Sequence, residues 1–110
     1  MRKILVFAIL SSLGSQICEA GWIYNLNAKD IRANLSPGGV TFTTVEAVQN
    51  PATCSGTEFY GIAYDANGHH KNVLAILLTA QATGRTVAIY VVDNSCYSAG
   101  RPLVTDVMIQ

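Results

Sequence analysis

The alternation of apolar and polar positions predicts β-strands in the first half of the chain. Residues 22–35 alternate in this way, which is typical of a strand with one buried face. Residues 40–48 show the same pattern, and the Ser-Pro-Gly-Gly turn between the two segments (36–39) predicts that they pair as a hairpin. After a polar loop (49–57), we expect a short aromatic strand over residues 59–64.

The hydrophobic period then changes from that of a strand to that of a helix. Apolar side chains recur three and four positions apart, which predicts a helix over residues 71–82, and Gly84 stands where a left-handed glycine would end it. The stripe comprises Val73, Leu74, Ile76, Leu77, Leu78 and Ala80, and Gln81 completes the spacing. Because the helix carries few charges, we expect most of its circumference to be covered. Two further strands are expected over residues 87–92 and 103–110, with a loop at 94–102 between them.

This element order, β-β-β-α-β-β, predicts a mainly β fold with one helix. It is the order of an OB-fold, a five-stranded Greek-key barrel with a helix between the third and fourth strands. We therefore expect a five-stranded OB-fold-like barrel in which the helix closes one end. The alternative is another small α+β sheet with the same element order.

The first twenty residues have the layout of a secretory signal peptide. Two basic residues precede an apolar run (4–10), and small residues stand three and one positions before Gly21. We expect residues 1–20 to be removed and residues 21–110 to form a single domain. The alternatives are a membrane anchor, for which the run is too short, and a lipoprotein, for which Ile17 before Cys18 is the wrong residue. The product is expected to be exported from a bacterium, into the periplasm or the medium.

Composition narrows the classes of function. Seven basic and seven acidic residues give the full chain a net charge of zero, so the phosphate attraction that drives nucleic-acid binding is missing. Without residues 1–20, five basic and six acidic residues remain, a net charge of −1. No later stretch is apolar for long enough to cross a membrane. We expect no nucleic-acid partner, no membrane span and no cofactor.

Two cysteines, Cys54 and Cys96, remain after the expected cleavage. In an exported chain such a pair predicts a disulfide. Their separation of 42 residues would give the bond about 4 kcal/mol by the entropy of loop closure. The alternatives are metal ligation and a reactive thiol. Neither a Cys-x-x-Cys motif nor a neighbouring His/Cys cluster supports a metal site.

His69 and His70 are the only histidines of the chain. Adjacent side chains diverge at the start of a helix, so we expect a solvated helix start rather than a metal site or a catalytic pair. The serines lack the context of a nucleophile, and the carboxylates show no paired acid and base. We therefore expect a protein that is not an enzyme. A small enzyme using His69 or His70 is kept as an alternative.

The aromatic residues divide into core and surface candidates. Core positions are expected for Phe42, Phe59 and Tyr90. Surface positions are expected for Trp22, Tyr24, Tyr60, Tyr64 and Tyr97, because rings with a polar edge often lie at interfaces.

Two groups of residues are candidates for ligand binding. The first is a loop next to Cys96 that carries Tyr97, Asp93, Asn94, Ser95 and Arg101. It offers a ring with hydrogen-bond donors and acceptors; the alternative is that Tyr97 only shields the disulfide. The second is the face of the second and third strands, where OB-folds bind oligosaccharides or oligonucleotides. That face is expected to carry Thr41, Thr43, Tyr60 and Tyr64. Because it has almost no Lys or Arg, it suits neutral sugars or proteins.

The segment 72–84, followed by residues 85–90, resembles the B subunits of pertussis-like and subtilase-type bacterial toxins. The shared features are a helix of small residues, then Thr-Gly, two further residues and Val-x-Ile-Tyr. The resemblance extends to other small exported bacterial proteins with this strand order. It implies an OB-fold, a pentameric ring and the binding of cell-surface glycans, and it identifies no sugar-binding residue on this chain.

These observations predict an exported, non-catalytic binding module. We expect a toxin-B-subunit-like module that recognises a glycan or a surface protein, as a homo-oligomer such as a pentamer. The alternative is a monomeric periplasmic protein that binds or inhibits another protein.

Overall fold

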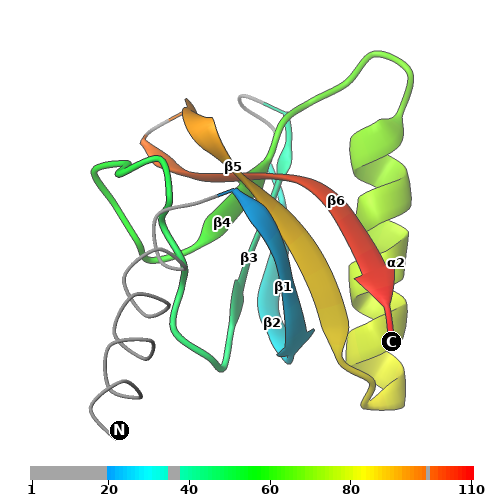
Figure 1. Ribbon diagram of the computed structural model, residues 1–110. Helices are drawn as coiled ribbons and strands as arrows, with labels where there is room; N and C mark the ends of the chain where they lie inside the picture. Colours follow the sequence, from blue (N-terminus) through cyan, green and yellow to red (C-terminus); the bar gives the residue numbers. More distant parts are fainter. Residues whose placement is uncertain (1–19, 35–37, 99) are drawn as a thin grey trace, which may run out of the picture.

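In the part of the chain that the structure describes, a mixed β-sheet with one helix beside it forms the fold (Figure 1), as the sequence predicted in outline. The computed structural model describes residues 20–34, 38–98 and 100–110. The elements are β1 (Gly21–Leu26), β2 (Ala28–Ala33), β3 (Val40–Thr44), β4 (Tyr60–Ile62), α2 (His69–Thr83), β5 (Val87–Tyr97) and β6 (Arg101–Ile109). Almost all of the expected signal peptide and half of the expected turn at 36–39 lie outside the described residues.

Within these residues the sheet has six strands in the order β1-β5-β6-β4-β3-β2, rather than the five expected. The β4–β6 pair is parallel, and the other pairs are antiparallel. The extra strand arises because the expected strand at 22–35 is divided at Asn27 into β1 and β2. These two consecutive strands stand at opposite ends of the strand order. One short segment of chain therefore supplies both outer strands of the sheet.

The division at Asn27 is held by the carboxylate of Glu46. The Asn27 backbone N–H donates to Glu46 Oε1 and the Asn27 side-chain amide donates to Glu46 Oε2, both at 2.8 Å. The Val45 N–H donates to the Asn27 carbonyl oxygen at 3.0 Å. Asn25 adopts a positive φ of 62°, which Asn tolerates better than most residues. Alternation of side chains cannot reveal such a bend, because the period of two continues through it.

Phe42 and Tyr60 form the centre of the core. They are partners in the β3–β4 register, and their ring centroids are 5.3 Å apart. The expected surface position of Tyr60 is wrong, because its side chain is 0% exposed. Its hydroxyl accepts a hydrogen bond from the Gln49 N–H at 2.8 Å, and burial raises the pKa of Tyr60 above its ordinary value. Phe59, expected in the core, stands just before β4 and is only half-buried.

The helix α2 is longer than expected, but less of its circumference is buried than expected. It follows Gly68, whose φ is 85°, and ends at Gly84, whose φ is 71°. The Arg85 N–H donates to the Ala80 carbonyl at 2.9 Å, as in a Schellman cap. Its buried residues are His70, Val73, Leu77 and Ala80, and the helix contacts β2, β3 and β6. The opposite face is exposed, so the expected burial of most of the circumference is wrong. Within the described residues, no helix is long and apolar enough to cross a membrane.

The expected loop at 94–102 is for the most part a β-hairpin. Strand β5 continues through these polar residues, and the register pairs Cys96 with Pro102 and Tyr97 with Arg101. The Gly100 N–H donates to the Tyr97 carbonyl oxygen at 2.9 Å and closes the turn. Residues 93–95 are polar because their side chains are exposed, and this composition concealed the strand. Strands β3 and β4 are shorter than predicted.

The Glu46–Asn27 contact predicts a loss of stability in acid. Hydrogen bonding from the Asn27 N–H holds the pKa of Glu46 below its ordinary value of 4.5. The contact therefore stabilises the fold above that value, and its contribution is lost as the pH falls through the lowered pKa. We expect Glu46→Gln to lower the free energy of unfolding at pH 7, and this difference to shrink below pH 4.5. Urea unfolding across pH 3–7 measures it. Asp93→Asn, at an exposed position of β5, is the control, and a difference that does not change with pH would contradict the assignment.

Candidate functional site

A depression of about 230 Å³ lies over β2, β3 and the segment that leads into β4. Six side chains line it: Asp30, Arg32, Thr41, Thr43, Glu58 and Phe59. The two threonines alternate along β3 with the core residues Phe42 and Thr44, so they point to the side of the sheet opposite the core. The sequence placed Thr41 and Thr43 on the ligand face but identified none of the other four residues.

An irregularity in β2 brings two of its three charged residues, Asp30 and Arg32, to the depression. The register with β3 shifts between Lys29 and Arg32. Within this shift Asp30 has a positive φ of 51°, a conformation that Asp adopts more readily than most residues. Bulges of this kind redirect side chains, and both Asp30 and Arg32 line the depression.

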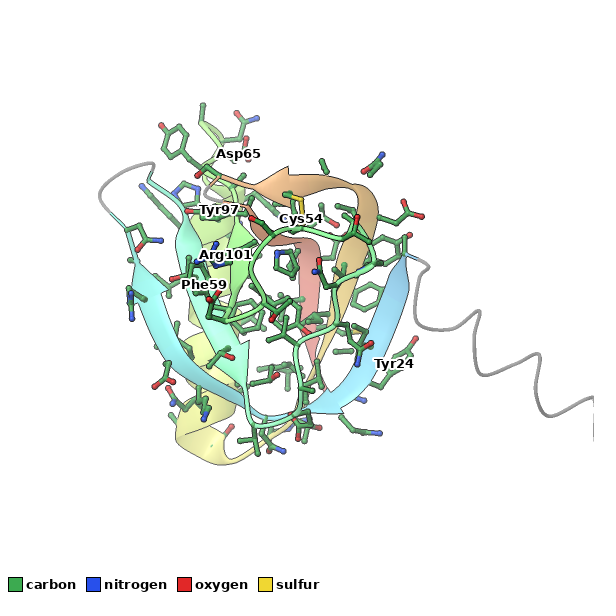
Figure 2. The ribbon with its side chains drawn as sticks, turned by 90° about the vertical axis from the view of Figure 1, so that its left-hand side faces the viewer. Tyr24, Cys54, Phe59, Asp65, Tyr97 and Arg101 are labelled. Carbon is green, nitrogen blue, oxygen red and sulfur yellow. A yellow bond between two sulfur atoms is a disulfide. The ribbon has the colours of Figure 1, made fainter. Side chains whose placement is uncertain are left out.

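Glu58 and Phe59 form the opposite wall of the depression, and Arg101 of β6 contacts both of them. Its Nε lies 2.7 Å from Glu58 Oε1, and its guanidinium carbon lies 5.0 Å from the centroid of the Phe59 ring. Figure 2 shows Arg101 and Phe59 side by side. Because the Glu58 side chain is 67% exposed, the ion pair contributes roughly 0–1 kcal/mol to stability. Its effect is to orient Glu58 and Phe59. Of the predicted ligand residues at the β5–β6 turn, Arg101 is the one that contacts this wall.

Tyr97 packs across the sheet beside this wall. Its side chain is 5% exposed, so its expected surface position is wrong. A Cβ at Gly61 would collide with the Tyr97 ring, and one at Gly39 would meet the Tyr97 hydroxyl. The side-chain amide of Asn34 donates to that hydroxyl at 3.4 Å. Tyr97 thus joins the end of β5 to β4 and to the β2–β3 connection.

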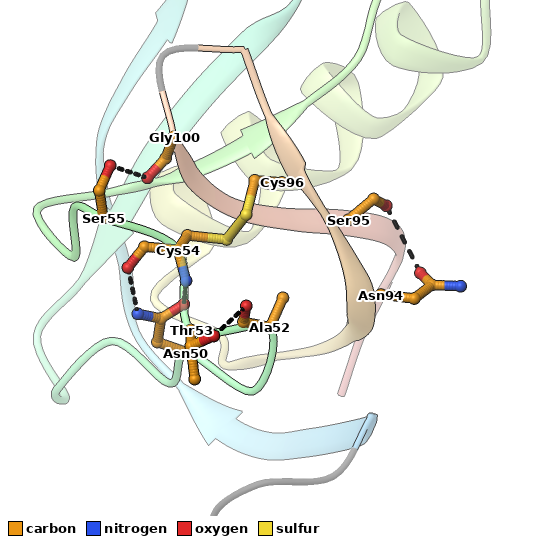
Figure 3. Close-up of a disulfide and its surroundings, with 9 residues drawn as sticks. All are labelled: Asn50, Ala52, Thr53, Cys54, Ser55, Asn94, Ser95, Cys96 and Gly100. Carbon is orange, nitrogen blue, oxygen red and sulfur yellow. Dashed lines mark hydrogen bonds between the residues drawn. A yellow bond between two sulfur atoms is a disulfide. The ribbon is translucent and has the colours of Figure 1, made fainter.

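The predicted disulfide between Cys54 and Cys96 is present (Figure 3), with Cα atoms 5.9 Å apart. It fastens the segment between β3 and β4 to β5. Asn50 supports it, since the Cys54 N–H donates to Asn50 Oδ1 at 2.8 Å and Asn50 Nδ2 donates to the Cys54 carbonyl at 2.9 Å. Two residues beyond Cys54, the Gly56 N–H donates to the Gly100 carbonyl at 2.9 Å. This segment ends in Glu58 and Phe59, so the disulfide and these bonds position the wall.

The remaining predicted ligand residues lie away from the depression. Asp93, Asn94 and Ser95 are exposed on β5. Tyr64 is 61% exposed and its ring contacts His70, with centroids 5.0 Å apart. Tyr60 belongs to the core. Tyr64 and Tyr97 line a second pocket beside Cys96, of about 200 Å³. Among the predicted ligand residues of the β5–β6 turn, Arg101 is the one that reaches the depression wall.

The histidines are placed differently from the expected solvated pair. His70 is buried, and its Nδ1 accepts a hydrogen bond from the Asp65 N–H at 3.1 Å. His69 is exposed; its Nε2 lies 2.9 Å from the Thr105 carbonyl oxygen, and its backbone N–H donates to Asp65 Oδ2 at 3.2 Å. The expectation is thus wrong for His70. Both imidazoles fix the start of α2 to its surroundings. In the described ranges, no three His, Cys, Asp or Glu side chains are grouped to hold a metal ion.

No known protein family matches this chain. A comparison with curated proteins finds no match either. The chemistry of the depression is therefore the basis for inferring what the protein binds.

Four lining residues escaped prediction from the sequence for physical reasons. Asp30 and Arg32 depend on a shift of register, which no residue pattern marks. Glu58 and Phe59 precede β4, and their positions are set by contacts with Arg101 and by the disulfide rather than by the alternation of a strand. Gly61 was the one sequence feature that indicated a close contact in this region, because a glycine in a strand marks close approach by another group. Here that group is Tyr97.

The contact between Gly61 and Tyr97 can be tested by adding one methyl group. We expect Gly61→Ala to lower the free energy of unfolding by about 1–3 kcal/mol, because the Cβ overlaps the packed ring. Gly21→Ala is the control, since its Cβ meets nothing within 4 Å, and it should change stability by less than about 0.5 kcal/mol. Chemical denaturation of both variants measures this. Equal losses in both variants would refute the contact.

Removal of the disulfide tests how the wall is held. The Cys54→Ala/Cys96→Ala variant should lose about 4 kcal/mol of stability, given the loop of 42 residues. Thr57→Ala, at an exposed position of the same segment, serves as the control. Urea unfolding of the oxidised protein and the variants provides the comparison. A loss below about 1 kcal/mol would mean that the hydrogen bonds of Asn50 and Gly100 hold the segment without the disulfide.

Proposed function

We propose that this chain is an exported, non-catalytic binding module that recognises a neutral glycan through the depression over β2 and β3. The observation that carries this proposal is the convergence of one aromatic ring and five hydrogen-bonding side chains on a single concave surface. Sugars combine apolar C–H faces with a dense set of hydroxyl groups. A site for them needs both kinds of contact within the width of one ring.

The lining residues supply complementary hydrogen-bonding roles. Asp30 and Glu58 accept hydrogen bonds from sugar hydroxyls, and Arg32 donates to them. The hydroxyls of Thr41 and Thr43 can do either. Phe59 supplies the apolar surface on which a pyranose ring packs.

Size and charge favour a neutral sugar unit. The volume of about 230 Å³ lies below the roughly 300–1,000 Å³ of typical small-molecule pockets, which suits one sugar residue of a longer glycan. The lining includes two carboxylates, Asp30 and Glu58, and one guanidinium, Arg32, and the nearby Arg101 is paired with Glu58. The depression therefore has no excess of positive charge to favour a phosphate or a sulfate.

The strand arrangement supports an OB-type barrel as the scaffold. The two outer strands, β1 and β2, are parts of one segment bent at Asn27, β4 and β6 run parallel, and α2 follows β4. In OB-folds the second and third strands form the ligand face. If the scaffold is an OB-type barrel, these strands correspond to β3 and β4, beside which the depression lies. The disulfide supports an oxidising compartment and hence export. The toxin-B-like pentamer remains part of the proposal, and light scattering over a concentration series would test it.

A glycan array probed with the purified, oxidised protein tests the proposal. We expect binding to neutral glycans. Arg32→Ala and Thr43→Val should each weaken the affinity for the best array glycan by about tenfold, because each removes a hydrogen bond to the sugar. Isothermal titration calorimetry measures the affinities, and thermal unfolding shows whether each variant remains folded.

Asn94→Ala is the matched control, because Asn94 is polar and exposed but lies on β5. Its affinity should equal that of the unchanged protein. Absence of binding to every glycan of the array, or full affinity in the Arg32→Ala/Thr43→Val double variant, would reject the depression as a glycan site.

A further inference from the structure

Three aromatic side chains form a cluster on the outer side of β1 and β5. Trp22 and Tyr90 are partners in the register of these strands, and their rings meet edge to face with centroids 5.7 Å apart. Tyr24 follows on the same side of β1, with its ring centroid 6.5 Å from that of Trp22 and the planes 26° apart. We call Trp22, Tyr24 and Tyr90 the aromatic surface.

The aromatic surface is exposed to solvent, and the strands beneath it hold its rings in place. Trp22 is 37% exposed and Tyr24 is 52% exposed, and Figure 2 shows Tyr24 projecting away from the sheet. Tyr90, which was expected in the core, is only half-buried and stands nearly perpendicular to the Trp22 ring, at 77°. The strands beneath are paired on both sides of β5. The two exposed rings are therefore held in nearly the same orientation before any ligand arrives, which lowers the entropic cost of binding.

The exposed area is too small for a stable protein interface. An aromatic side chain presents about 150–250 Å² when fully uncovered, so the exposed parts of Trp22 and Tyr24 amount to on the order of 200 Å². Met108, 41% exposed on β6, adds to this area without changing its order of magnitude. A stable protein complex needs about 800 Å² from each partner. The area matches instead the apolar face of a few sugar rings.

The neighbouring polar group favours an uncharged ligand. Asp106 pairs with Tyr90 in the β5–β6 register, so its carboxylate lies beside the aromatic surface. It is exposed and accepts a hydrogen bond from the Thr105 hydroxyl at 3.3 Å. A carboxylate in this position accepts hydrogen bonds from hydroxyl or amide groups and repels anionic sugars and phosphates.

We propose that the aromatic surface is a second carbohydrate site, which binds neutral β-1,4-linked oligosaccharides by stacking. In β-1,4-linked glucose and N-acetylglucosamine the ring substituents are equatorial, so each ring exposes C–H faces that fit an aromatic ring. A chain laid along β1 meets Trp22 and Tyr24 in turn, with Asp106 at its edge. This site lies on β1 and β5, whereas the depression lies on β2 and β3, so neither site depends on the other.

Intrinsic fluorescence reports on this site directly, because Trp22 is the only tryptophan in the chain. The probes are cellohexaose and chitohexaose, added to the oxidised protein. We expect a saturable change in tryptophan emission with at least one of them. Tyr24→Ala should weaken the apparent affinity by about tenfold, because it removes one of the two stacking rings.

Two further variants distinguish stacking on the aromatic surface from binding elsewhere on the protein. Tyr64→Ala removes another exposed tyrosine that lies beside His70, and it should leave the titration unchanged. The Arg32→Ala/Thr43→Val variant should also leave it unchanged, even though the depression is disabled. The change in tryptophan emission should thus be observed even if the depression binds no sugar.

Three results would overturn the second site. The first is an unchanged emission with both oligosaccharides. The second is a titration that Tyr24→Ala does not weaken. The third is an emission that depends on protein concentration without sugar, because it would assign the aromatic surface to contact between copies of the chain.

Discussion

The clamp between Glu46 and Asn27 is the contact on which the arrangement of this protein depends. A straight strand from residue 21 to residue 33 would pair with β5 or with β3, but not with both. The carboxylate of Glu46 binds both the backbone N–H and the side chain of Asn27, and the chain changes direction there. Strand β1 then pairs with β5, and β2 pairs with β3. The same bend places Trp22 and Tyr24 of the aromatic surface before Asn27 and Asp30 and Arg32 of the depression after it.

A second set of contacts makes the depression rigid. Tyr97 packs into the space left by Gly61, the disulfide fastens Cys54 to the end of β5, and Arg101 orients Glu58 and Phe59. The packing of Tyr97 and the disulfide contribute most of the free energy that stabilises this part of the fold, since the exposed ion pair contributes little. A site held in this way loses little conformational entropy when a ligand binds. This is the physical basis for expecting recognition of a sugar, whose contacts are individually weak.

Much of the framework could be predicted from residue patterns. Periodicity predicted the helix, its end at Gly84, most of the strands and the β2–β3 pairing, and the cysteine count predicted the disulfide. The errors occurred where a contact between distant residues decides the outcome. The predictions for Tyr60 and Phe59 were both wrong, because the pairing of Tyr60 with Phe42 determines that Tyr60 is the buried residue. The polar end of β5 is a strand because its turn pairs Tyr97 with Arg101. His70 can be buried because its Nδ1 accepts a hydrogen bond from the Asp65 backbone N–H, a contact that no residue pattern marks.

A crystal structure of the oxidised protein with its best neutral array glycan tests the central claim most directly. The account predicts a sugar ring packed against Phe59, with its hydroxyls within hydrogen-bonding distance of Asp30, Arg32 and Thr43. A glycan that is bound elsewhere on the protein, with the depression free of sugar, would contradict it.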